Sequence, residues 1–142
     1  MLFLASDHAG YELKEHIHLR LHERGVAFED FGTFSEKMDD FPGYALRVAK
    51  EVVKHHGRGI LVCGSGHGMT IVANRFKGVR AITAWNAEAA KRGREEEDAN
   101  ILSLPARLVT NEEGWEIVST FLATSFAHLD RYKRRIEQTD AF

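Results

Sequence analysis

The chain has 142 residues and a formal net charge of -2, with 19 lysines and arginines, 21 acidic residues and 44% apolar residues. Its length suits a single domain that buries roughly two-thirds of its unfolded surface, and its composition is globular rather than disordered or fibrous. The slightly negative charge argues against a general nucleic-acid-binding protein.

The first residues of the chain and its single cysteine indicate the cellular compartment of the protein. Residues 1–7 have no basic region before their apolar run and become polar too early for a signal peptide. No apolar stretch approaches the roughly 20 residues that cross a bilayer. One cysteine cannot form an intrachain disulfide, which suits a reducing compartment. We therefore expect a cytoplasmic protein without a membrane partner.

Strands and helices are predicted to alternate along the chain. Apolar runs predict strands at residues 2–5, 26–31, 60–62, 78–84 and 100–104, the last stopped by Pro105. Helices are predicted at residues 11–24, 44–55, 69–76, 86–95 and 112–126, before a polar, basic segment at 130–138. This alternation predicts βαβ units, a mostly parallel sheet and helices on both of its faces, within one domain.

A glycine-rich loop follows the predicted strand at residues 60–62. Its three glycines, Gly64, Gly66 and Gly68, stand at alternate positions before an apolar, helix-compatible run. A strand, a glycine turn and a helix start form an anion site, because free N–H groups of the helix point out of the turn. The loop lacks the spacing of a dinucleotide fingerprint and the lysine of a P-loop. Alternate glycines can direct several N–H groups at one oxygen, or can simply allow a tight turn.

The only cysteine, Cys63, is the last residue of the strand before this loop. A lone cysteine in a strand often serves as a small buried apolar residue. Here the partial positive charge of the following helix start favours the thiolate. We therefore expect a lowered pKa for Cys63 and some thiolate at neutral pH.

Two further groups of polar residues are candidates for binding or chemistry. Asp7 and His8 follow the first strand, where open parallel sheets place their functional groups, although Asp7 could also cap the next helix. Arg107 follows the fifth strand. Arg131 and Arg135 lie four residues apart in the tail, so one helix face could present both to a phosphate, or could simply be solvated.

Several short motifs follow one another along essentially the whole chain. They are Ser6-Asp7-His8-Ala9-Gly10, Asp39-Asp40-Phe41-Pro42, Cys63-Gly64-Ser65-Gly66-His67-Gly68-Met69-Thr70-Ile71, Ala73-Asn74-Arg75, Gly78-Val79-Arg80-Ala81, Asp98-Ala99-Asn100-Ile101-Leu102, Ala106-Arg107 and the paired tail arginines. In their order and spacing they resemble the type B ribose-5-phosphate isomerases and the related galactose-6-phosphate isomerase subunits. The resemblance implies a Rossmann-like α/β/α sandwich with a five-stranded parallel sheet. It also implies a homodimer or a dimer of dimers with shared active sites, onto which the tail at about residues 128–142 packs from a neighbouring subunit.

The resemblance further implies a reaction without metal or cofactor, in which an aldose phosphate and a ketose phosphate interconvert through a cis-enediolate. The substrate would be ribose 5-phosphate, with a galactose or allose 6-phosphate as the alternative. Cys63 corresponds to the base that moves a proton between C1 and C2, and Asp7 to a residue that handles hydroxyl protons. Ser65 and the N–H groups of residues 64–68 correspond to the enediolate cradle.

The phosphate site is implied in the same way. His8 and Arg107 correspond to phosphate ligands of one subunit, and Arg131 and Arg135 to phosphate ligands of its neighbour. Both groups would be needed for one site.

One departure from the family pattern stands just before Asp98. Glu96 and Glu97 occupy positions where the family usually has a histidine that opens the sugar ring and an asparagine that holds the enediolate. Glu96 could act as the ring-opening acid if burial raised its pKa, or His67 could supply the imidazole. The pair could also indicate another sugar phosphate, or a subunit that binds sugar phosphates without catalysis.

Overall fold

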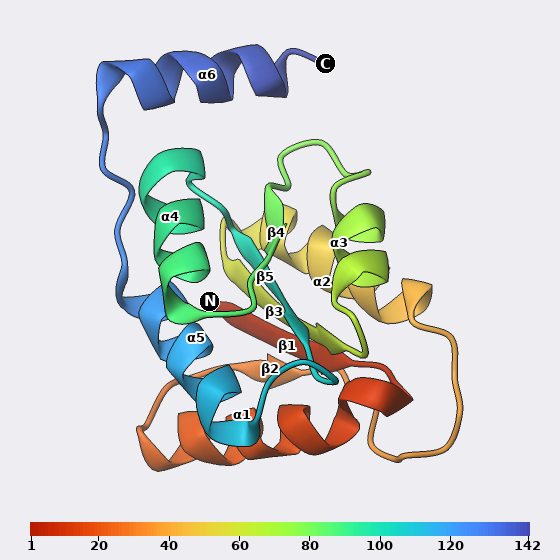
Figure 1. The fold of residues 1–142 in the computed structure, drawn as a ribbon. Helices are drawn as coiled ribbons and strands as arrows, with labels where there is room; N and C mark the ends of the chain where they lie inside the picture. Colours follow the sequence, from red (N-terminus) through yellow and green to blue (C-terminus); the bar gives the residue numbers. More distant parts are fainter.

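The structure, a computed structural model, describes residues 1–142. Its elements, shown in Figure 1, are β1 (Leu2–Ser6), the short 3-10 helix η1 (His8–Gly10), α1 (Tyr11–Glu23), β2 (Glu29–Asp30), α2 (Pro42–His55), β3 (Arg58–Cys63), α3 (His67–Ala73), β4 (Ala81–Thr83), α4 (Ala87–Glu97), β5 (Ile101–Pro105), α5 (Asn111–Ala123) and α6 (Asp130–Asp140). No helix is long and apolar enough to pass through a bilayer.

The five strands form one parallel sheet in the order β2-β1-β3-β5-β4. From β1 the chain moves outward to β2, and from β3 it moves to the other side of the sheet, so the direction reverses between β1 and β3. Open α/β sheets bind ligands at the carboxyl ends of the strands beside such a reversal. The edge of the sheet at which the parallel strands end is called the carboxyl edge below, and the edge at which they begin is called the amino edge.

Helices cover both faces of the sheet. Side chains along each strand point alternately to the two faces, so both faces present apolar side chains that helices bury. Leu2 and Leu4 of β1 belong to the core cluster that contains residues of α1, α4 and α5, whereas Phe3 and Ala5 belong to the cluster that contains residues of α2 and α3. Every residue of β1 and β5 is buried. The predicted three-layer α/β/α sandwich is confirmed (Figure 1).

Two predicted strands are shorter than expected. β2 contains only Glu29 and Asp30, because it lies at the edge of the sheet and pairs only with Phe3 and Leu4 of β1. β4 begins at Ala81, because the Asn74 side chain bonds both backbone groups of that residue, at 2.9 and 2.8 Å. The same asparagine ends α3 three residues before the expected boundary, and the intervening chain forms a loop.

α6 stands apart from the rest of the molecule. None of its residues is buried, and Figure 1 shows it lying across the amino edge, above the end of α4. The N–H of Ala127 donates to the carbonyl of Glu95 at 3.0 Å, and Arg80 Nη1 lies 3.1 Å from Asp140 Oδ2. These contacts tie the tail helix to the amino edge while leaving its sides free.

Candidate active site

Three of the sequence-predicted groups meet at the carboxyl edge, beside the reversal between β1 and β3. The N–H of Asp7, just after β1, donates to the carbonyl of Val62 in β3 at 3.2 Å. The N–H of Arg107, just after β5, donates to the carbonyl of Gly64 at 3.0 Å. Cys63 and the glycine loop therefore have Asp7 on one side and Arg107 on the other, as expected for residues that follow neighbouring parallel strands.

At each glycine of the loop, a Cβ atom would come too close to a different neighbouring residue. A Cβ on Gly64 would lie 2.6 Å from Arg107 Nη1, and one on Gly68 would lie 2.6 Å from Cζ of Phe41. Gly66 has a φ of +80°, and a Cβ there would lie 2.9 Å from Cγ2 of Thr83. Larger residues would push the Arg107 guanidinium and the Phe41 ring away, so the glycines bring both groups onto the loop.

Cys63 is almost fully enclosed, with 4% of its surface exposed. Its Sγ accepts a hydrogen bond from the N–H of Gly66 at 3.1 Å. Burial raises the pKa of the Cys63 thiol above its ordinary value, and the N–H groups of the loop and the start of α3 offset only part of this. The predicted lowering of the pKa is therefore wrong for the single chain, because the cost of burying the charge exceeds the effect of the helix start.

Asp7 is also buried, with 6% of its surface exposed, and it caps η1 through a 3.0 Å hydrogen bond from the N–H of Gly10 to Oδ1. The predicted capping role is confirmed. Burial raises the pKa of Asp7, and the bond from Gly10 and the nearby His8 lower it only in part. The Asp7 charge in turn raises the pKa of Cys63.

Asp7→Asn is expected to stabilise the fold at neutral pH. Asparagine keeps the oxygen that accepts the Gly10 N–H but lacks the charge that burial disfavours. Because the folded-state pKa is raised, the wild type loses stability relative to the variant as pH rises from 3.8 through that folded value. Thermal unfolding at pH 7 and below pH 3.8 measures the difference. A Tm advantage of the same size at both pH values would contradict this explanation.

The ring of His8 is held by two residues that the sequence reasoning did not assign to the site. Nδ1 of His8 lies 3.1 Å from Oδ1 of Asp39, which also accepts the backbone N–H of His8 at 2.8 Å. The Tyr44 hydroxyl donates to Oδ2 of Asp39 at 2.9 Å. Burial alone would raise the pKa of Asp39, but these hydrogen bonds lower it below its ordinary value. Asp39 is therefore a carboxylate at neutral pH that fixes the ring of His8 and leaves Nε2 free.

The remaining candidates at this edge are exposed. The side chains of Ser65 and His67 point away from the core, and Arg107 is exposed above Gly64. The N–H of His67 makes only a long bond of 3.3 Å to Oγ of Ser65. Arg107 has no carboxylate partner within the chain. A cation without a carboxylate partner, beside a helix-start N–H that makes only a long hydrogen bond, suits an anionic ligand.

The other predicted site residues lie at the amino edge, so one chain does not bring them to Cys63. Glu96 is on the last turn of α4, with 32% of its side chain exposed and its carboxylate 3.1 Å from Arg92 Nη1. The burial that would make it an acid is absent in the single chain. Arg131 and Arg135 are exposed on α6, which is tied to the same edge by the Arg80–Asp140 pair.

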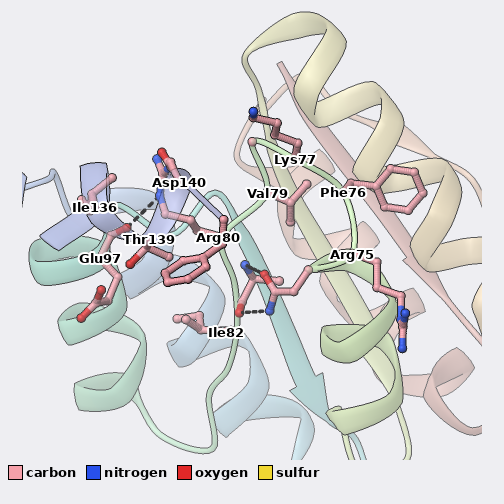
Figure 2. Close-up of a pocket in the computed structure, with 14 residues that line it drawn as sticks. Arg75, Phe76, Lys77, Val79, Arg80, Ile82, Glu97, Ile136, Thr139 and Asp140 are labelled. Atoms are coloured by element: carbon pink, nitrogen blue, oxygen red, sulfur yellow. Dashed lines mark hydrogen bonds and ion pairs between the residues drawn. The ribbon is translucent and has the colours of Figure 1, made fainter.

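Two cavities lie at the amino edge. One of about 500 Å³ lies between α6 and the loop that joins α3 to β4, and Figure 2 shows Arg80, Asp140 and Ile136 on its walls. A second, of about 480 Å³, is lined by Arg58, Arg80 and Arg94. Neither includes Cys63.

Comparison with known proteins relates this arrangement to a family. Residues 2–139 match the family described as Ribose/Galactose Isomerase. The chain is 38% identical over 136 residues to ribose-5-phosphate isomerase B of Escherichia coli, covering 95% of this chain and 91% of the relative. It is 37% identical over 138 residues to the Mycobacterium leprae protein of the same name, covering 96% and 85%.

Solved structures give the same result. A ribose 5-phosphate isomerase of Thermotoga maritima superposes with a TM-score of 0.96 at 42% identity, covering 99% of this chain and 97% of the other. Ribose-5-phosphate isomerase B of Mycoplasma genitalium, solved with bound ribulose-5-phosphate, superposes with a TM-score of 0.93 at 36% identity, covering 99% and 93%. With this agreement over nearly its whole length, the chain belongs to the ribose/galactose isomerase family.

Proposed function

We propose that this protein interconverts ribose 5-phosphate and ribulose 5-phosphate, with Cys63 as the base. The observation that carries the proposal is the placement of the Cys63 thiol, the Asp7 carboxyl and the N–H groups of the glycine loop at one point of the carboxyl edge. Relatives that align over nearly the whole chain are named for this reaction, and one was solved with its ketose product.

The chemistry of isomerisation accounts for these groups. Removal of the proton from C2 of the open-chain aldose places negative charge on O1, and return of the proton to C1 completes the ketose. The Cys63 thiolate takes the proton from C2 and, as the thiol, gives it back to C1. N–H groups at the start of α3, with Ser65, stabilise the charged oxygen, while Asp7 moves the hydroxyl proton between O2 and O1.

The phosphate lies, in this proposal, between groups of two subunits. His8, fixed by Asp39, and Arg107 come from the subunit that supplies Cys63. Arg131 and Arg135 come from the partner, because α6 is at the far edge of its own chain and buries nothing there. Bidentate arginines suit a phosphate, and their rigid fork favours a fixed orientation.

A dimer is also supported by the surface around the thiol. Five large apolar side chains of this edge are more than half exposed in the single chain: Phe34 (68%), Met38 (85%), Ile71 (60%), Trp85 (60%) and Leu108 (69%). Exposed apolar side chains gathered around a polar centre are typical of an interface. A second copy placed here would cover them.

Two residues, Glu96 and His67, are candidates for the group that opens the sugar ring. Glu96 would reach the site from the partner, together with the tail arginines of the same edge, and contact with that partner would supply the missing burial. His67, exposed on the loop itself, would reach it from the same subunit. The alternatives of a hexose 6-phosphate substrate and of a binding subunit without catalysis both follow from Glu96 and Glu97.

A panel of phosphorylated sugars tests the function. Ribose 5-phosphate is expected to give the highest kcat/KM, with galactose 6-phosphate and allose 6-phosphate weaker, in an assay that follows ketose formation. Glu96→Gln and His67→Ala, assayed on ribose 5-phosphate, identify the ring-opening group by which of them lowers turnover. A preference for a six-carbon substrate would replace the proposal, and binding of all sugars without turnover would favour the non-catalytic subunit.

We also propose that the protein acts in the cytoplasm. Its single cysteine is a free thiol, and the role given to Cys63 requires that it stay reduced.

A further inference from the structure

Beneath the glycine loop lies a group of three hydroxyl side chains that the reaction described above does not use. Ser103 of β5 and Thr83 of β4 are direct neighbours in the sheet, and Thr70 lies on the first turns of α3. Ser103 has none of its surface exposed. A buried hydroxyl in the middle of an apolar strand is costly unless it makes a hydrogen bond, so the partner of Ser103 is informative.

That partner is the carbonyl oxygen of Gly66. Ser103 Oγ donates to it at 2.7 Å, Thr70 Oγ1 donates to it at 3.0 Å, and the N–H of Thr70 reaches it at 3.3 Å. Thr70 Oγ1 also lies 2.7 Å from Thr83 Oγ1. Either hydroxyl can donate in this last bond. The three hydroxyls therefore form one connected group beneath the Gly66 carbonyl.

Gly66 is consequently held at both of its ends. Its N–H donates to Cys63 Sγ at 3.1 Å, and its carbonyl receives the hydroxyl groups from below. The carbonyl belongs to the peptide group whose other end is the N–H of His67. Hydrogen bonds to a carbonyl polarise the peptide and strengthen its N–H as a donor.

We propose that Ser103, supported by Thr70 and Thr83, is a positioning residue for the isomerisation. Its hydroxyl fixes and polarises the Gly66–His67 peptide, which keeps the N–H of Gly66 on the Cys63 sulfur and presents the N–H of His67 to the oxygen that becomes charged. This inference rests on the proposed role of the glycine loop. Ser103 itself acts through the backbone and does not touch the substrate.

Ser103→Ala tests the inference, and the chain offers a matched control. Ser6 on β1 is equally buried, but its Oγ has no hydrogen-bond partner, so Ser6→Ala removes a hydroxyl without removing a bond. Ser103→Ala is expected to lower kcat about three- to tenfold, the effect of one hydrogen bond, with KM within about twofold. Ser6→Ala is expected to match the wild type in both constants. A role limited to stability would lower Tm but leave kcat unchanged.

A second measurement needs no substrate. The rate at which iodoacetamide alkylates Cys63, followed by mass spectrometry across pH, reports the thiolate that the Gly66 N–H stabilises. Ser103→Ala is expected to slow this alkylation at a given pH, and Ser6→Ala is not. If the wild type did not isomerise ribose 5-phosphate, the proposed function would fail while this comparison still decided the role of Ser103.

A lower kcat or slower alkylation in Ser103→Ala, with KM unchanged, supports the inference. Equality of Ser103→Ala and Ser6→Ala in both measurements overturns it. If Ser103→Ala does not fold, Thr83→Val decides in its place, because it preserves side-chain shape while removing the hydroxyl that bonds Thr70. It is expected to lower kcat about two- to threefold, and an unchanged kcat and alkylation rate would then overturn the proposal.

Discussion

Cys63→Ala is expected to lower isomerisation of ribose 5-phosphate by about 10²- to 10⁴-fold, the usual contribution of a positioned base. The side chain is small and its Sγ makes one hydrogen bond, to the N–H of Gly66, so the variant should fold. Binding of inorganic phosphate, measured by calorimetry, should stay close to the wild-type value because the phosphate ligands are untouched. Retention of more than a tenth of the wild-type kcat would remove Cys63 from the role of base.

The kcat/KM of the wild type should depend on pH in the way that a thiolate base at Cys63 requires. The base must be a thiolate, and burial raises the pKa of the Cys63 thiol above its ordinary value. The thiolate fraction of the free enzyme, and with it kcat/KM, is therefore expected to increase with pH through neutrality and into the alkaline range. Alkylation of Cys63 should follow the same curve. A kcat/KM that is constant between pH 6 and pH 9 would require a base other than this thiol.

Arg135→Ala is expected to raise KM for ribose 5-phosphate by about ten- to a hundredfold, which is the effect of losing a charge-assisted hydrogen bond to phosphate. Tm should change little, because Arg135 is exposed and contacts nothing buried. Lys133→Ala, on the same helix and equally exposed, is the matched control and should leave KM unchanged.

Whether Arg135 comes from a partner chain can be tested by mixing two variants that each have little activity at low substrate concentration. When Cys63→Ala and Arg135→Ala chains exchange at random, half of the dimers contain one chain of each. In these mixed dimers one site has both native residues, so the mixture should recover about a quarter of the wild-type activity at low substrate concentration. If both residues served the site of one chain, every site would lack one of them and mixing would recover nothing.

The sequence predicted the elements of the sheet and the meeting of Asp7, Cys63 and Arg107 at one edge, because these depend on local patterns. Apolar runs define the strands, and residues that follow parallel strands necessarily reach the same edge. The capping of η1 by Asp7 is equally local, since donor and acceptor lie three residues apart.

Quantities that depend on distant contacts were not predictable in this way. The raised pKa of Cys63 comes from its burial between the sheet and α3, which a motif does not report. Asp39 reaches His8 from 31 residues away, and only the short acidic motif before α2 pointed to it. The hydroxyl of Ser103 required the knowledge that β5 lies between β3 and β4, which strand periodicity does not contain.

The tail helix has a further consequence for how the molecule works. An isolated helix of 11 residues is only marginally stable in water, and α6 gains no buried side chain from its own subunit. In the proposed dimer, contact with the partner would support the tail helix and complete the phosphate site in the same event. A newly made subunit would have Cys63 and the glycine loop in place but would be inactive until it bound a second copy. The activity per subunit would therefore increase with the concentration of the protein.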